Sequence, residues 1–153
     1  MKFFATLIIF CFSINTFANE LISEKHKNEV KKLQGKWEIQ SLEIAGKLSK
    51  QVKGMAFTIK GNQLIIPTNG GAPMIATYTV SPEKEPKQLT FIINDEIGDK
   101  LINNSIYQIT GDELKLCFIS ANRPGISHPF PKTFKTDKSM PMSALFIFKR
   151  VKE

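Results

Sequence analysis

The sequence predicts an all-β protein: an eight-stranded, antiparallel, up-and-down barrel preceded by a short N-terminal helix. After Gly35, apolar and polar residues alternate with a period of two almost to the end of the chain, which is typical of strands with one buried face. Glycine beside asparagine or aspartate recurs between the alternating stretches, where it favours tight reversals. Most connections are short, so we expect consecutive strands to be antiparallel neighbours.

The first 18 residues are predicted to be a signal peptide. Lys2 gives a minimal positive start, residues 3–14 form an apolar core, and Ala18 offers a small residue for cleavage. This core of about a dozen residues is short for a membrane span, although a membrane-anchored N-terminus is the alternative. Cys11 follows a bulky residue inside the apolar run, which argues against lipidation there.

Cleavage after Ala18 leaves residues 19–153, which we expect to form one domain with no transmembrane segment and a secreted or periplasmic location. Loss of Lys2 lowers the formal net charge from +7 to +6. The basic residues are scattered and form no aromatic-basic cluster, so no nucleic-acid partner is expected. Cys117 is the one cysteine left, and the fold must form without an internal disulfide.

A helix is expected before the first strand. Residues 19–34 are rich in lysine and glutamate with sparse apolar points, and Ser23 can cap a short helix. Gly35 suits the C-terminal end of that helix.

Eight stretches alternate and are bounded by glycine, proline, asparagine or aspartate. The expected strands span residues 36–45, 54–60, 63–67, 73–81, 88–94, 100–110, 113–120 and 143–151. One apolar face per strand can be buried by curling the sheet into a closed barrel. A two-sheet sandwich is the rival, but it would normally need longer crossover connections.

Residues 121–142 form one long connection, rich in proline, with no clear period. Long loops in compact domains are usually functional or disordered. We expect this loop to cross one end of the barrel, with one strand-like stretch around Lys132 to Lys135.

The single tryptophan lies at the start of the first expected strand, in Gly35-Lys36-Trp37. We expect its indole to point inward at the end that the N-terminal segment closes. Arg150 lies on the last strand, which neighbours the first in a barrel. Its guanidinium can lie across the indole and donate to nearby carbonyls, an interaction of about 1–2 kcal/mol when partly desolvated.

This pairing of Gly-x-Trp with a late arginine resembles the lipocalins and the wider calycin superfamily. The stretches LQGKWEIQSLEIAGK (33–47), GDELKLCF (111–118) and LFIFKRVK (145–152) resemble a bacterial lipocalin-like domain family of unassigned function. The resemblance covers nearly all of residues 19–153. It implies an eight-stranded barrel with an internal cavity, a structural role for Gly35, Trp37 and Arg150, and no catalytic residue. Secreted lipocalins often carry a disulfide, which this chain cannot form.

The sequence offers little for catalysis, and no enzyme, cofactor or metal site is expected. His26 lies in the polar N-terminal stretch and His128 in the long loop. Cys117 with His128 would be the pair for a hydrolase or a metal. However, Cys117 alternates with Leu116 and Phe118 and should therefore point out of the barrel. No Gly-x-Ser-x-Gly or His-x-x-x-His motif is present.

The interior is therefore the candidate site. The large side chains expected to point inward are Phe57, Met74, Tyr78, Phe91, Tyr107, Phe118, Phe146 and Phe148. Alternation predicts the same pattern for a packed core and for a hollow one that holds a small ligand. Lys132 and Lys135 could attract an anionic head group at the mouth. We expect an exported binding protein for a small apolar or amphipathic, fatty-acid-like molecule. The alternative is an envelope interaction or inhibitor module that binds a protein partner through residues 121–142.

Overall fold

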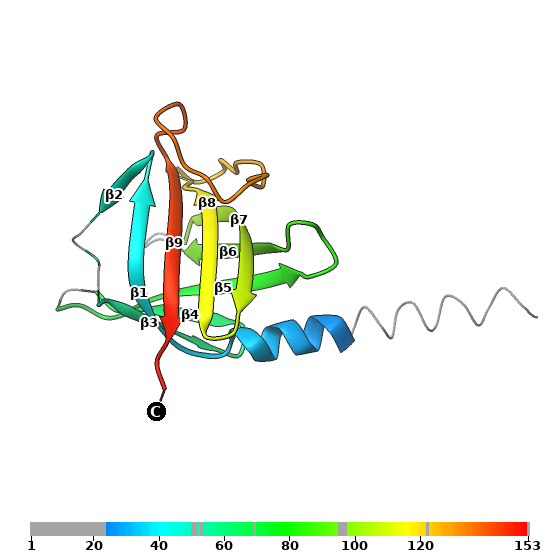
Figure 1. Ribbon diagram of the computed structural model, residues 1–153. Coiled ribbons are helices and arrows are strands. Elements are labelled where there is room, and N and C mark those ends of the chain that lie inside the picture. Colours follow the sequence, from blue (N-terminus) through cyan, green and yellow to red (C-terminus); the bar gives the residue numbers. More distant parts are fainter. Residues whose placement is uncertain are drawn as a thin grey trace, which may run out of the picture.

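The computed structural model describes residues 24–49, 52, 54–68, 70–94, 98–121 and 123–152. These residues form a closed barrel of eight antiparallel strands, with one extra strand and one short helix that precedes the barrel (Figure 1). The expected signal peptide, its cleavage site after Ala18 and the expected cap at Ser23 lie outside the described residues. No helix within the described ranges is long and apolar enough to cross a bilayer.

The eight expected strands are present, each within two residues of its predicted bounds. The strands are β1 (Gly35–Ile44), β2 (Lys47–Ser49), β3 (Ala56–Lys60), β4 (Gln63–Ile66), β5 (Met74–Ser81), β6 (Gln88–Asn94), β7 (Lys100–Thr110), β8 (Glu113–Ile119) and β9 (Ser143–Arg150). The added strand is β2, which pairs with the end of β1 through a turn at Ala45-Gly46.

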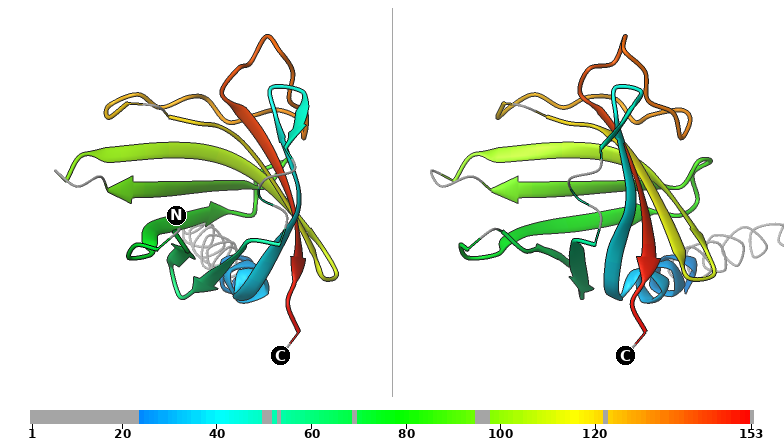
Figure 2. Two further views of the ribbon diagram at one scale, coloured as in Figure 1. Left: turned by 90° about the vertical axis from the view of Figure 1, so that its left-hand side faces the viewer. Right: turned by 60° about the vertical axis from the view of Figure 1, so that its left-hand side comes forward.

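Closure of the sheet confirms the barrel and excludes the sandwich. Each strand from β3 to β9 pairs antiparallel with the next, and β1 pairs with both β3 and β9. In the closing pair, Trp37 lies opposite Arg150 and Leu42 opposite Phe146. The two views in Figure 2 show the strands curving around a single interior. From β3 to β9 the pairs follow the chain order, and the pairing of β1 with β9 closes the barrel.

The two ends of the barrel differ. Residues 24–33 are helical and lie at the end where β1 begins and β9 finishes; we call this the closed end (Figure 1). The opposite end, where β1 and β8 finish and β5, β7 and β9 begin, is the open end. The long connection 121–142 joins β8 to β9 there.

Side chains fill the closed half of the barrel almost completely and leave one small void of about 20 Å³ beside Leu33, Leu89 and Leu114. Leu33 from the helix, Trp37 and Tyr107 have at most 1% of their surface exposed. Leu89 and Leu114 complete one continuous apolar cluster with them. Burial of these large side chains is the main favourable contribution to the fold, at about 25 cal/mol per Å² of apolar surface.

Two expectations about the long loop were wrong. No strand forms around Lys132 to Lys135, because both edges of β1, β8 and β9 are already paired in the barrel. The loop also does not lie across the mouth. After Ala121, which lies at the cavity, its hydrogen bonds to the barrel are with the outer wall: Asn104 Nδ2 donates to the His128 carbonyl at 2.9 Å, and the Thr136 hydroxyl donates to Glu43. In Figure 2 the loop (orange) runs along the outside of the wall.

Candidate functional site

The closed end is sealed by the predicted contact between Trp37 and Arg150. The guanidinium carbon lies 4.1 Å from the centroid of the indole ring. Its two terminal nitrogens donate to the carbonyls of Gln34 and Lys32, the latter at 2.6 Å. The indole N–H donates to the Leu33 carbonyl at 2.8 Å. The last carbonyls of the helix are thereby satisfied by the two residues that close the sheet.

Gly35 belongs to the same structure. It has a φ of +112°, and a Cβ added there would lie 3.1 Å from Arg150 Nη1. Only glycine tolerates this backbone conformation without strain, so the turn from helix to β1 depends on it.

A buried carboxylate fixes the helix to the barrel. Glu29 is 3% exposed and accepts from Lys32 and Lys87, both at 2.9 Å. The Tyr107 hydroxyl donates to its other oxygen at 3.3 Å. Burial alone would raise the pKa of Glu29, but the two lysines outweigh it and lower the pKa below its ordinary value. Burial, together with the Glu29 charge, raises the pKa of Tyr107.

The open half of the barrel is hollow. A cavity of about 290 Å³ lies between the packed closed half and the open end. It is lined by Ile39, Met55, Ala56, Phe57, Leu64, Ile66, Pro67, Met74, Phe91, Ile93, Leu101, Asn103, Leu116, Phe118, Ser120, Ala121, Phe146 and Phe148. The surface of this cavity is almost wholly apolar, so it favours an apolar occupant over ordered water.

Packed phenylalanines form one wall of the cavity. Phe118, Phe146 and Phe148 lie in a stacked row, with ring centroids 5.9 Å and 5.3 Å apart. Phe57 meets this row edge-on at 4.6 Å and Phe91 at 5.1 Å. Such contacts hold each ring in place, so the wall is formed before any occupant arrives.

Among the described side chains that line the cavity, the polar groups are the amide of Asn103 and the hydroxyl of Ser120. Asn103 is 3% exposed, and its Oδ1 accepts the Ala121 N–H at 2.9 Å. This bond fixes the amide plane and leaves Nδ2 as its donor group. Both residues lie toward the open end, because β8 finishes at Ile119 and Asn103 is the fourth residue of β7.

Five of the ligand-binding candidates from sequence line the cavity: Phe57, Met74, Phe91, Phe118 and Phe148. The structure places the other four elsewhere. Tyr78 and Tyr107 point inward but lie in the closed half, where the Tyr78 hydroxyl donates to the Gly61 carbonyl at 2.9 Å. Lys132 and Lys135 lie on the outer loop and do not line the cavity.

The residues that sequence reasoning missed are mostly aliphatic side chains on inward positions, such as Ile93 and Leu116. Asn103 was also missed. It shares a face with Ser105 and Tyr107 on β7, so a polar residue at an inward position was the available signal.

Cys117 points out of the barrel, as alternation predicts, yet it is only 1% exposed. The long loop covers it, and its thiol lies 3.8 Å from the Lys135 carbonyl. Burial raises the pKa of the thiol. Within the described ranges, no three His, Cys, Asp or Glu side chains gather in a way that could hold a metal ion.

His26 lies on a surface groove between the helix and β5. The groove measures about 600 Å³, and Lys27, Lys31 and Tyr78 also line it. His26, Lys27 and Lys31 are all exposed. The groove is therefore wet and open, unlike the cavity.

Large apolar side chains are exposed around the mouth of the cavity. In the described part of the chain, those more than a third exposed are Ile44, Leu48, Met55, Met74, Ile75, Ile126 and Met142; we call them the apolar rim. Six stand at strand ends or turns of the open end, and Ile126 lies in the loop between β8 and β9. Met55 and Met74 also line the cavity, so the rim continues into the interior.

Comparison of this chain with protein-family models, with curated proteins and with solved structures gave no match.

Proposed function

We propose that this protein is an exported lipocalin-like binding protein that holds one small apolar or amphipathic molecule in the open half of its barrel. The observation that carries the proposal is the apolar cavity of about 290 Å³. Ligand sites typically measure about 300–1,000 Å³ and are mostly apolar with a few polar groups, so this cavity suits a small ligand. The resemblance of the chain to lipocalin-like domains implies a barrel with an internal cavity, which agrees with this proposal.

The polar groups of the cavity suggest how an amphipathic ligand would lie. Asn103 and Ser120 are near the open end, whereas the deeper wall is made of Ile39, Leu116 and the phenylalanine row. A fatty-acid-like molecule would therefore bury its tail toward the closed half. Its head would accept from Asn103 Nδ2 or the Ser120 hydroxyl.

A chain-length series of fatty acids, from hexanoate to hexadecanoate, tests the proposal by calorimetry. Each buried methylene should tighten binding by about 0.8 kcal/mol, or about fourfold in Kd, until the tail fills the cavity. Beyond that length the gain should stop. A flat series with no measurable binding, together with no copurified molecule in native mass spectrometry, would contradict the proposal.

Ile93 and Ile92 offer a matched pair of variants on β6. Ile93 lines the cavity, whereas the adjacent Ile92 points to the outer face, opposite Ile102 and Thr77. Ile93→Trp should fill the cavity and weaken binding at least tenfold. Ile92→Trp adds the same bulk outside the barrel and should leave Kd within about twofold.

Asn103→Asp tests the orientation of the head group. The new carboxylate keeps an acceptor for the Ala121 N–H but places negative charge at the mouth. Dodecanoate should bind at least tenfold more weakly and dodecanol should be much less affected. The difference should grow with pH, since a buried carboxyl at position 103 holds its proton at lower pH. Equal losses for both ligands would show that the head does not lie at Asn103.

The alternative function is a protein-interaction module that uses the long loop. The exposed Ile126 beside the exposed Arg123 favours this candidate. Because the loop covers Cys117, its excision would also uncover the wall, and point variants are the better test. Ile126→Ser with Arg123→Ser should abolish capture of an envelope protein if the loop binds one. Unchanged capture would reject it.

A further inference from the structure

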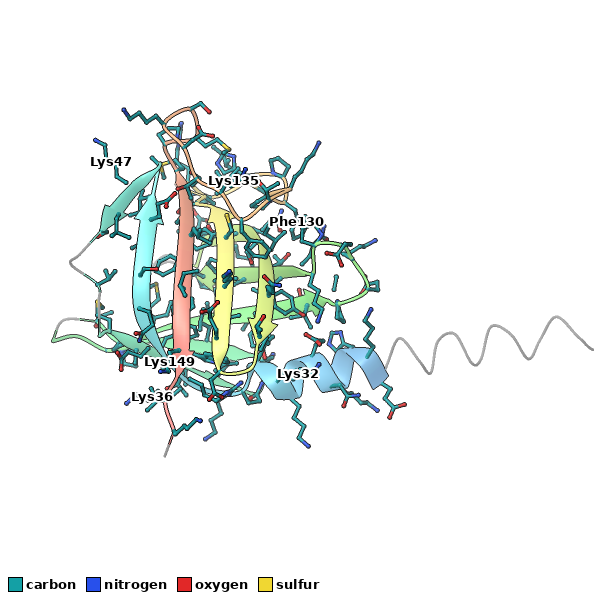
Figure 3. The ribbon with its side chains drawn as sticks, viewed as in Figure 1. Lys32, Lys36, Lys47, Phe130, Lys135 and Lys149 are labelled. Atoms are coloured by element: carbon teal, nitrogen blue, oxygen red, sulfur yellow. The ribbon has the colours of Figure 1, made fainter. Side chains whose placement is uncertain are left out.

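The apolar rim around the mouth is surrounded by positive charge. Lys47 begins β2, Lys100 begins β7, and Arg123, Lys132, Lys135 and Lys138 lie on the long loop, all exposed. The described acidic residues of the open end are Glu43, Asp99 and Asp137, so the described residues of this end comprise six cations and three anions. Glu43 and Asp137 are already hydrogen-bonded to Thr136 and Ser139. In Figure 3, Lys47 and Lys135 lie at the open end, away from Lys32, Lys36 and Lys149 at the closed end.

We propose that the open end docks on an anionic lipid bilayer, with the apolar rim in the headgroup boundary and the lysines against lipid phosphates. Exposed apolar side chains flanked by lysines are the combination that binds anionic membrane surfaces. Docking itself rests on the apolar rim and the lysines around it, and it does not depend on the proposed function. The further step, that the cavity exchanges its occupant with the bilayer, rests on the proposed function.

The shape of the rim favours a fluid partner over a folded protein. The rim includes Met55 and Met74 at the mouth of the cavity, so a rigid protein surface placed on the rim would leave that mouth as a void. Lipid chains can follow an irregular surface, and three of the seven rim residues are methionines, whose flexible side chains adapt to such contacts.

The rim is also continuous with the interior. Met55 and Met74 are 37% exposed, and both line the cavity. A molecule leaving a docked bilayer would therefore meet apolar side chains along its whole path. It would not need to cross water before entering the cavity.

Vesicle flotation tests the docking, using the chain as recovered after export and vesicles of phosphatidylcholine with or without phosphatidylglycerol. Binding should require phosphatidylglycerol and weaken at high salt. Leu48→Ser with Ile75→Ser removes two rim residues that do not line the cavity, and should weaken binding at least tenfold. Because every variant has the same N-terminus, that segment cannot explain a difference between them.

A charge-matched pair separates local docking from general attraction. Lys47 is at the rim and Lys60 is at the closed end of β3, and both are exposed. Lys47→Glu should weaken vesicle binding about fivefold or more, whereas Lys60→Glu should change it by less than twofold. Equal effects of the two changes, equal binding by the rim variant and the parent chain, or no vesicle binding at all would each overturn the proposal.

The cavity-filling variant Ile93→Trp distinguishes this proposal from the proposed function. It should bind vesicles as the parent chain does while failing to bind dodecanoate. If the parent chain binds vesicles but no fatty acid, the binding function is overturned and docking stands. If the parent chain binds fatty acid but no vesicles, docking is overturned and the binding function stands.

Discussion

At the scale of single residues, the clearest role belongs to Arg150. It stacks on Trp37 and donates to two helix carbonyls, so one side chain joins the indole, the helix and the last strand. A lysine carries the same charge but cannot reach both carbonyls and stack at once. This explains in physical terms why Gly-x-Trp and a late arginine occur together.

Arg150→Lys should therefore destabilise the protein by about 1–3 kcal/mol. Urea unfolding followed by tryptophan fluorescence measures this directly, because Trp37 is the single tryptophan of the chain. Arg123→Lys is the matched control on the exposed loop and should change the unfolding free energy by less than about 0.5 kcal/mol. Equal effects of the two changes would show that the cation–ring contact contributes nothing measurable.

For Cys117, the sequence predicted that the side chain points out of the barrel, but it did not predict that the long loop covers the thiol. Alternation places it on the outer face, where exposure would be the default. The structure covers it with the long loop, and burial raises the pKa of its thiol. A neutral, covered thiol is a poor nucleophile.

Cys117 should accordingly react with Ellman's reagent at least a hundredfold more slowly in the native protein than in urea, in a Cys11→Ala background. Thr136→Val should speed the native reaction, because the Thr136 hydroxyl donates to Glu43 and accepts the Gly46 N–H at 3.0 Å, holding the loop to the wall. Native labelling as fast as in urea would contradict the covered position of the thiol.

At the scale of elements, the helix is held by a buried charge that no sequence pattern predicts. Glu29 lies among many exposed lysines and glutamates of residues 24–33, yet it is the buried one. Nothing in the local pattern marks it, because its burial comes from Lys87 and Tyr107, which are distant in sequence. The periodicity of apolar residues along the sequence cannot predict tertiary contacts of this kind.

The lowered pKa of Glu29 makes helix docking sensitive to acid. Since the folded pKa is below the ordinary 4.5, the stabilisation is fully present above that pH and is lost as the pH falls through the folded value. Glu29→Gln should cost about 1–3 kcal/mol at neutral pH, and the difference from the parent chain should shrink in acid. Urea unfolding at both pH values measures it. The exposed Glu24→Gln is the control, and a pH-independent difference would exclude the linkage.

The strands were predictable and the loop was not. All eight connections between the nine strands carry glycine or proline, and alternation predicted the inward face of each expected strand. By contrast, β2 has three residues, too few to show a period. The strand expected around Lys132 to Lys135 lies in a connection without a clear period, and a closed barrel leaves no free edge for it.

At the scale of the whole molecule, alternation determines which side chains point inward but not how deep they lie. Tyr78 and Phe91 are both inward, yet one lies in the packed half and the other at the cavity. Depth follows from position along the barrel axis, which depends on strand tilt and on where the helix closes the end. The division into a solid half and a hollow half is therefore a property of the assembled sheet.

Leu114 and Leu116 test this division within one strand. Both point inward on β8, at 2% and 7% exposure, but Leu114 lies in the packed half and Leu116 lines the cavity. Leu114→Ala opens most of a side-chain volume beside a void of only about 20 Å³ and should cost about 3–5 kcal/mol. Leu116→Ala only enlarges an existing space and should cost about 2–3 kcal/mol. This is close to the free energy of transferring the removed atoms from water into the interior, without the added cost of a new cavity.

The same pair should also separate in ligand binding. Leu116→Ala lengthens the space available to a tail, so the fatty acid at which the chain-length gain stops should be longer by one or more methylenes. Leu114→Ala should leave that length unchanged, because Phe57, Leu64 and Leu116 stand between its void and the cavity. Chemical unfolding and calorimetry on the two variants give both results. Equal stability losses with equal chain-length limits would mean that the closed half is no more solid than the open one.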